Sequence, residues 1–495
     1  MKSKRTRTGA TGLIRIIPLI IMVLAIQSLH AGEKSSRGAN DAVRRMLREV
    51  TGVTEGDISA ARESKELSLF NAYALAMFNT EVMAIEGEHS VQARLRREQA
   101  ITSFLPTLSL RANKSYPEMK ENYVSASRSM VSLVARLPVI TGLDEASRIT
   151  SSVAEVKMRR MELHDAAGRL LVDVATAFYN ALRIEESLKN SEEMLGLHER
   201  MLRELERRVA IGRSRRSDVL RTRAQMYRLE ADITSLRNGL AHARVVLENL
   251  VGTRDAYVLK EGKEPPTPGY SGKDADSIAE KRWDVKAARE RIDYARAGVL
   301  SALGMHLPSA YIEGAYMLYQ EKAEAARWER ALQAYRSPTS LLTRTRYRDH
   351  YVSLGVEVPL LGPDVTFAKT REARSVKRQA DLGLSMALRL ARQDIIDAYQ
   401  TWESSQKELE AFRRALEAAE QNNRTVSAEY RMNLVTILDV LTSLTSLQNA
   451  KDDYRRALLQ HRLDRIRLGV ATNEWYGDTM TVLKNTDAGT PAEQD

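Results

Sequence analysis

The stretch from Ala368 to Gly469 constrains the fold most, because it predicts two long antiparallel helices that meet at a tight turn near residues 431–439. In the first helix, apolar residues recur at 4,4,3 spacing, an eleven-residue repeat that predicts nearly straight packing. They are Val376, Ala380, Leu384, Ala387, Ala391, Ile395 and Ala398. At Leu409, Phe412, Leu416 and Ala419 the spacing shortens to the seven-residue repeat of left-handed coiled coils. Roughly sixty helical residues at about 1.5 Å each predict a rod of about 100 Å.

Composition excludes several kinds of chemistry. Cysteine is absent, which excludes disulfides, thiolate metal sites, cysteine nucleophiles and acylation of an N-terminal cysteine. The eight histidines lack a metal-binding helical spacing, and no glycine-rich phosphate loop occurs. We therefore expect no enzyme, no cofactor and no metal site. Five of the ten net positive charges lie in the N-terminal segment, which contains no acidic residue, and the remaining charges alternate in sign along helices. This alternation is typical of solvated faces, so no nucleic-acid partner is expected.

The N-terminus has the layout of a secretory signal peptide over residues 1–31. A basic start precedes the apolar run from Ile16 to Leu29, and small residues follow at Ala31 and Gly32. The run is too short for a comfortable membrane span, and no later stretch approaches eighteen apolar residues. The chain is thus predicted to be exported, and any membrane crossing must use strands. Residues 32–64 form a polar N-terminal segment without an assigned role, with a short helical pattern at Val43, Met46, Leu47 and Val50.

The remainder is predicted to be a tandem duplication, because Asp218-Val219-Leu220 matches Asp439-Val440-Leu441 and Val131–Pro138 matches Val352–Pro359. The first repeat, 65–252, contains helices over about 66–103, 139–210 and 215–250 and strands within about 105–137, ended by Pro138. A linker covers 253–277. The second repeat, 278–472, contains helices over about 279–305, 364–431 and 436–470 and strands over about 307–319 and 350–358. The insertion at 320–350 has no assigned role, and 473–495 is a C-terminal tail.

The strands alternate apolar and polar residues, which gives each pair one apolar face. In an exported protein, strands of about ten residues with this pattern fit an outer-membrane β-barrel. The alternative is a small soluble sheet whose apolar face packs on a core. Four strands cannot close a barrel, because the smallest membrane barrels have about eight, so several copies must share one.

Several short sequences then carry a family resemblance over roughly Glu66 to Trp475. They are Phe104-Leu105-Pro106-Thr107-Leu108, Ala177-Phe178-Tyr179, Arg282-Trp283-Asp284-Val285 and Val358-Pro359-Leu360. In this order the chain resembles the TolC-like outer-membrane channels of efflux pumps and type I secretion systems. The resemblance implies a mainly α protein with membrane β structure, a homotrimer whose twelve strands form one barrel on an α-helical periplasmic tunnel.

The implied function is a passive, gated exit duct in the outer membrane. The tunnel would dock to a periplasmic adaptor, or membrane fusion, protein and through it to an inner-membrane pump. The transported substrate, the adaptor and the pump are not identified by the sequence, nor is efflux distinguished from type I secretion. The alternatives are a soluble periplasmic coiled-coil scaffold or adaptor and, if residues 1–31 are not a signal, a cytoplasmic nucleic-acid-binding rod.

The resemblance also implies site residues at the two helix tips. Each tip needs a residue with positive φ, which Gly212 supplies in the first repeat and Asn433 in the second. The adaptor-docking surface would comprise Ala210, Ile211, Gly212, Arg213, Met432, Asn433 and Leu434. The pore constriction would be formed by Asp439 and by Thr442, which stands where the family often has a second aspartate.

A gate network would join Tyr430 to Asp218 at the other tip. Val435 stands where the family's assisting arginine is found, so this role would pass to Arg431, Arg215 or Arg216. A simpler interpretation of Asp218 and Asp439 is capping of helix starts, and for Tyr430 it is packing between the tips. Arg136 and Glu357 are predicted to face the lumen, either as lining charges or as partners in a mutual salt bridge.

Overall fold

The computed structural model describes residues 41–50, 52–115, 128–141, 143–253, 257–262, 269–270, 272–320, 350–359, 367–432 and 434–474. The predicted signal peptide and most of the 320–350 insertion and C-terminal tail lie outside these ranges. The chain divides into two compact units. The helical unit contains the described parts of Met1–Val91, Arg159–Ala287 and Leu384–Asp495, and the sheet unit contains those of Gln92–Met158 and Ala288–Gly383.

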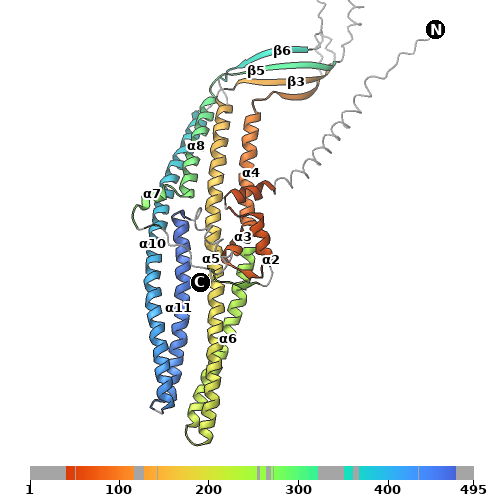
Figure 1. Cartoon of the computed structure of the whole chain (residues 1–495). Helices are drawn as coiled ribbons and strands as arrows, with labels where there is room; N and C mark the ends of the chain where they lie inside the picture. Colours follow the sequence, from red (N-terminus) through yellow and green to blue (C-terminus); the bar gives the residue numbers. More distant parts are fainter. Residues whose placement is uncertain are drawn as a thin grey trace, which may run out of the picture. The chain divides into compact units, whose positions relative to one another are not determined.

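The sheet unit contains one four-stranded antiparallel sheet in the order β2-β3-β5-β6 (Figure 1). Its strands are β2 (Thr107–Ser115), β3 (Arg128–Thr141), β5 (Ser309–Gln320) and β6 (His350–Glu357). Each repeat contributes two strands, and β3 joins β5 across the duplication. The four predicted strands are therefore confirmed, and the structure joins the two predicted pairs into a single sheet in which β2 and β6 are the edges.

The register places the predicted apolar residues of all four strands on one face. Leu110 lies opposite Leu133, which lies opposite Tyr316, and Ile312 lies opposite Leu354. This face is open to solvent in the single chain, because Leu108 is 69% exposed and Leu354 is 70% exposed. The alternative of a sheet whose apolar face packs on a soluble core is therefore not favoured.

Two predicted boundaries near β3 are wrong. Pro138 does not end the strand, which continues to Thr141 and pairs Pro138 with Tyr311 of β5. Proline is tolerated there because the pairing of β3 with β2 ends at Arg136, so position 138 needs no amide hydrogen bond to β2. Pro138 also lies next to a register irregularity in the pairing of β3 with β5. The helix expected from residue 139 begins accordingly at Asp144 and forms α5 (Asp144–Ala210).

The helix predicted over 66–103 is interrupted. Residues Glu66–Leu67 form the short strand β1, and the helix is split into α3 (Leu69–Asn79) and α4 (Glu81–Thr102). Ser68 begins α3 by accepting a hydrogen bond from the Asn71 amide, and Thr80 ends it in an extended conformation. The short α3 is apolar on all sides, and eight of its eleven residues are buried.

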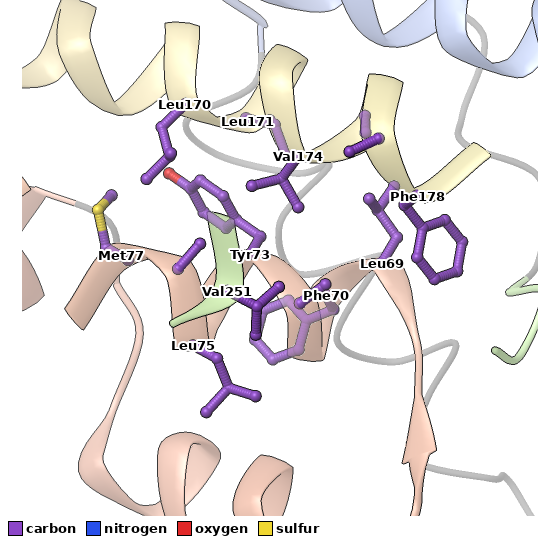
Figure 2. Packing of buried hydrophobic residues seen from close by; sticks show 14 of the residues in the cluster. Leu69, Phe70, Tyr73, Leu75, Met77, Leu170, Leu171, Val174, Phe178 and Val251 are labelled. Carbon is purple, nitrogen blue, oxygen red and sulfur yellow. The ribbon is translucent and has the colours of Figure 1, made fainter. Parts of the chain in front are cut away.

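The core of the helical unit surrounds α3 (Figure 2). Leu69 and Tyr73 point toward α5, and the Tyr73 hydroxyl donates to the Ala167 carbonyl oxygen at 3.3 Å. The N-terminal segment packs on the same core. Residues 41–50 form a helix, and the four residues of its predicted apolar pattern are all buried. This segment and the following α2 (Glu55–Glu63) therefore have a structural role that the sequence alone did not assign.

The predicted linker contains regular structure. Strand β4 (Val258–Leu259) pairs in parallel with β1, and α7 (Ala275–Ala279) precedes α8 (Trp283–Gly304). The helix predicted from residue 279 therefore starts later, at Trp283. The linker is thereby attached to residues almost two hundred positions earlier in the chain.

The long helices form two hairpins, α5 with α6 (Arg216–Val251) and α10 (Phe367–Arg431) with α11 (Ile437–Ala471). In α6 the predicted seven-residue pattern is buried at Leu229, Ile233, Leu240, Ala243 and Leu247. In α10 the eleven-residue pattern is buried at Ala380, Ala391 and Ile395, whereas Val376 is exposed. The prediction of a mainly α protein built from long packed helices is confirmed. No helix within the described ranges is long and apolar enough to cross a membrane.

Candidate functional site at the two helix tips

The first tip is the turn between α5 and α6, and it is closed by backbone hydrogen bonds. The Arg213 amide donates to the Arg208 carbonyl at 2.7 Å, and the Gly212 amide donates to the Val209 carbonyl at 2.9 Å. This pair of bonds is the Schellman motif, which requires a left-handed residue just beyond the helix. Gly212 has a φ of 71°, so its predicted positive φ is confirmed.

The second tip, between α10 and α11, repeats this closure. The Leu434 amide donates to the Glu429 carbonyl at 3.0 Å, at the positions equivalent to Arg213 and Arg208. Asn433 lies outside the described residues, so its positive φ stays a prediction. The exposed docking candidates include Ile211, Met432 and Leu434, each at least 66% exposed.

A shared apolar cluster holds the ends of the two hairpins together. It contains Val219 and Val440, which are equivalent in the two repeats, together with Leu229, Ile437 and Leu444. The duplication is not symmetrical in its packing. Leu441 is 7% exposed, whereas its equivalent, Leu220, is 56% exposed. The two tips therefore present different surfaces although they share a plan.

Both tip aspartates cap the start of a helix. The Asp439 carboxylate accepts from the Thr436 hydroxyl at 2.6 Å and from its amide at 2.8 Å, and these bonds hold the pKa of Asp439 below its ordinary value. The Asp218 carboxylate accepts from the Ser214 hydroxyl at 3.2 Å and from the Arg215 amide at 3.3 Å. Capping thus accounts for both positions. It leaves Asp439 exposed to solvent, as a lining charge must be.

Thr442 is also exposed, one helical turn beyond Asp439, and its hydroxyl donates to the Leu438 carbonyl at 2.8 Å. Leu438 and Thr442 line a groove of about 900 Å³ that also includes Arg221 of α6 and Asp453 of α11. A hydroxyl bonded to its own helix carries no charge, so Thr442 adds none to the charge of the Asp439 carboxylate. Both pore-constriction assignments stay predictions.

Tyr430 is half-buried between the tips, and burial raises the pKa of its hydroxyl. The Arg208 guanidinium carbon lies 4.9 Å from the centre of the Tyr430 ring, and the same guanidinium donates to Glu204 at 2.7 Å. Sequence reasoning missed Arg208. Its four-residue spacing from Glu204 predicts an ion pair within the helix, but nothing local indicates a contact with α10.

The other candidate arginines are placed differently. Arg431, Arg215 and Arg216 are exposed, and none of them forms an ion pair within the described part of the chain. Within the described residues, the cation contact of the Tyr430 ring is with Arg208. Whether Tyr430, Asp218 and Arg431 act as a gate stays a prediction.

Arg136 and Glu357 lie in the sheet unit, on the face opposite the exposed apolar residues. The Arg136 guanidinium lies 3.7 Å above the Tyr311 ring, and Glu357 pairs across from Ser309. The same face carries Glu313, opposite Arg136 on β5. These charges share a polar face, as predicted, and their lumen-facing role stays a prediction.

Comparison with known proteins places this geometry in a wider context. Residues 85–253 match the family model described as outer membrane efflux protein. The outer membrane protein TolC of Vibrio cholerae is 23% identical over 330 residues, which cover 64% of this chain and 72% of that protein. The outer membrane protein TolC of Escherichia coli is 22% identical over 332 residues, which cover 64% of each chain.

Solved structures share the fold. The outer membrane protein VceC of Vibrio cholerae superposes with a TM-score of 0.67 at 18% identity, over 82% of this chain and 95% of that one. The CmeC outer membrane channel of Campylobacter jejuni superposes with a TM-score of 0.67 at 14% identity, over 86% of this chain and 90% of that one. Residues 85–253 are thus similar to the outer membrane efflux protein family, and the duplicated helical hairpins and the four-stranded sheet form the fold that these solved structures share.

Proposed function

We propose that this chain is the outer-membrane exit duct of an efflux or secretion assembly, and that three copies form one channel. The observation that carries the proposal is the sheet with one apolar face that no other part of the described chain covers. A face with Leu354 and Val352 each at least 70% exposed is costly in water and favourable against lipid.

The edges of the sheet support assembly of several copies. Among the described residues, strands β2 and β6 each have one unpaired side, and unpaired backbone groups in lipid cost several kcal/mol apiece. Pairing β2 of one copy with β6 of the next would satisfy both edges. Three copies of four strands would supply twelve strands, within the range of known membrane barrels.

The helix tips would form the periplasmic docking site, where a periplasmic adaptor would bind and link the duct to an inner-membrane pump. The exposed apolar side chains of Ile211, Met432 and Leu434 supply a contact surface at this site. Passage through the duct would be passive and would involve no chemistry on the transported substrate. The exposed Asp439 carboxylates of three copies would narrow its entrance.

Conductance in a planar lipid bilayer tests the duct and the role of Asp439 together. The wild-type protein should form a narrow pore that prefers cations, and Asp439→Ala should reduce that preference. Thr436→Ala is the matched control, because it removes one hydrogen bond of the same cap and keeps the carboxylate. Loss of preference in both variants would assign the effect to the cap, and an unchanged preference in Asp439→Ala would remove this residue from the entrance.

Tyr430 can be tested in the same assay. Tyr430→Phe should raise the conductance if the hydroxyl holds the tips closed. The phenylalanine ring keeps the packing and the contact with Arg208, so an unchanged conductance would leave Tyr430 only a packing role. Arg208→Gln separates the contribution of the cation from that of the Tyr430 hydroxyl, because it removes the Arg208 charge and leaves Tyr430 unchanged.

Membrane fractionation distinguishes the duct from a soluble periplasmic scaffold. The duct should be recovered in the outer-membrane fraction and should run as a trimer in detergent. Recovery of folded, monomeric protein from the soluble fraction would refute the proposal.

A further inference from the structure

The two tips differ sharply in charge. Between residues 203 and 221 the first tip has seven arginines and three carboxylates, a net charge of +4. Over the equivalent residues 424–442 the second tip has two arginines and two carboxylates, a net charge of zero. Five arginines of the first tip, which together contribute +5, have uncharged equivalents, and the other exchanges between the tips sum to −1. Arg207, Arg213, Arg215, Arg216 and Arg221 correspond to Ala428, Leu434, Thr436, Ile437 and Thr442. We call these five the tip arginines.

The tip arginines are not used by the chain itself. All five are exposed, and within the described residues none of them forms an ion pair. Nearby arginines behave differently, since Arg208 pairs with Glu204 and Arg223 pairs with Glu206. The first tip therefore has a surplus of free guanidinium groups.

Two of the tip arginines oppose the stability of their own helix. Arg215 occupies the N-cap of α6 without a side-chain capping bond to the helix, and Arg216 is the first helical residue. The N-terminus of a helix carries partial positive charge, so cations there are unfavourable. The second tip has the favoured arrangement, with Thr436 as N-cap. Local stability does not explain arginine at these positions, whereas contact with an external anion does.

From this asymmetry we infer that the first tip binds an acidic surface of the periplasmic adaptor, while the second tip contributes apolar contact. This inference rests on the proposed function and specifies the partner's surface. Guanidinium groups bind carboxylates in bidentate geometry, which gives both attraction and orientation. Ile211 is 66% exposed at the centre of the basic turn, and Met432 and Leu434 are exposed on the neighbouring tip. A surface that combines apolar and basic groups fits a folded protein better than a phosphate polymer or a lipid headgroup, which requires only charge.

Binding of matched probes to the purified trimer tests the inference. The probes are two synthetic helical hairpins that are identical except for glutamates or glutamines at the tip. At low salt the trimer should bind the glutamate hairpin about tenfold more tightly, since three exposed charge pairs of ordinary strength give about this factor. The preference should largely vanish in 1 M salt, where the Debye length falls to about 3 Å. Equal binding of the two hairpins at low salt would overturn the inference.

A charge-matched pair of variants localises the effect. Arg213→Gln/Arg215→Gln/Arg216→Gln should lose the preference for the glutamate hairpin and remain trimeric. The control, Arg371→Gln/Arg374→Gln/Arg378→Gln, removes the same charge from exposed positions of α10 that lie about 80 Å along the helix from its tip. It should retain the preference. Equal losses in the two variants would indicate a general effect of net charge and contradict the inference, and dissociation of the tip variant into monomers would assign the arginines to contacts between copies.

Two further probes test the competing partners. Vesicles of phosphatidylglycerol and phosphatidylcholine represent an anionic membrane, and thirty-nucleotide poly(dT) represents nucleic acid. A competing result is that the trimer binds the vesicles or poly(dT) more tightly than the glutamate hairpin and loses this binding in Arg213→Gln/Arg215→Gln/Arg216→Gln. That result would overturn the inference and assign the tip arginines to a membrane or to nucleic acid. Bilayer conductance of the wild-type and control proteins is measured in parallel. If both conduct but neither hairpin binds, the inference fails and the exit duct stands; if neither protein conducts or trimerises, the proposed function fails.

Discussion

Replacement of Gly212 by alanine tests the physical account of the first tip. Gly212 has a φ of 71°, and a Cβ atom added there would meet nothing within 4 Å. The cost of Gly212→Ala is therefore conformational and not steric, about 1–2 kcal/mol for a left-handed residue with a side chain. The hydrogen bond from the Arg213 amide to Arg208 should open about 5- to 30-fold more often.

Gly196→Ala is the matched control for this prediction. Gly196 lies inside the same helix α5, has no positive φ, and a Cβ atom there would also meet nothing within 4 Å. Alanine should stabilise this position by up to about 1 kcal/mol, because glycine is unfavourable inside a helix. Hydrogen exchange measured by mass spectrometry on peptides that cover the tip should show faster exchange in Gly212→Ala and unchanged or slower exchange in Gly196→Ala. Slower exchange in both variants would refute the reasoning.

Three further outcomes are expected. The His164 ring is 9% exposed and stacks on Trp283 at 4.2 Å, and burial lowers the pKa of this ring to about 4. The free energy of unfolding that depends on a neutral ring is therefore fully present above pH 6.5 and is lost as the pH falls toward 4. Between pH 7 and pH 4.5, His164→Phe should therefore lose about 2 kcal/mol less free energy of unfolding than the wild type, after allowance for solvent screening. The His164 resonance is identified in NMR spectra by its absence from the variant, and its titration near pH 6.5 in the wild type would contradict this prediction. Gly87→Ala should destabilise the packing of the helix over residues 41–50 by about 1–3 kcal/mol, because the new Cβ would lie 2.5 Å from Val43 Cγ1. The variant should be cleaved faster in a proteolysis assay, and the double variant Gly87→Ala/Val43→Ala should recover part of the lost protection. Asn433→Gly should slow hydrogen exchange at the second tip, because glycine adopts positive φ at lower cost; faster exchange would show that the tip does not use this conformation.

The sequence by itself determined the elements whose signal is local and periodic. The apolar spacing in α6 and α10 predicted the long helices, and strict alternation predicted four strands with a single apolar face. The need for positive φ identified Gly212 because only the backbone of one residue is involved. The family resemblance added the functional interpretation of the tips, which these patterns do not contain.

The tertiary structure decided everything that depends on which surfaces meet. Periodicity shows that a face is apolar and does not name the face that covers it. For this reason only the structure revealed the ring contact between Arg208 and Tyr430, the pairing of β1 with β4, and the interruption of the first helix at Thr80. It also gave the N-terminal segment its place on the core around α3, because burial there depends on residues far away in the chain.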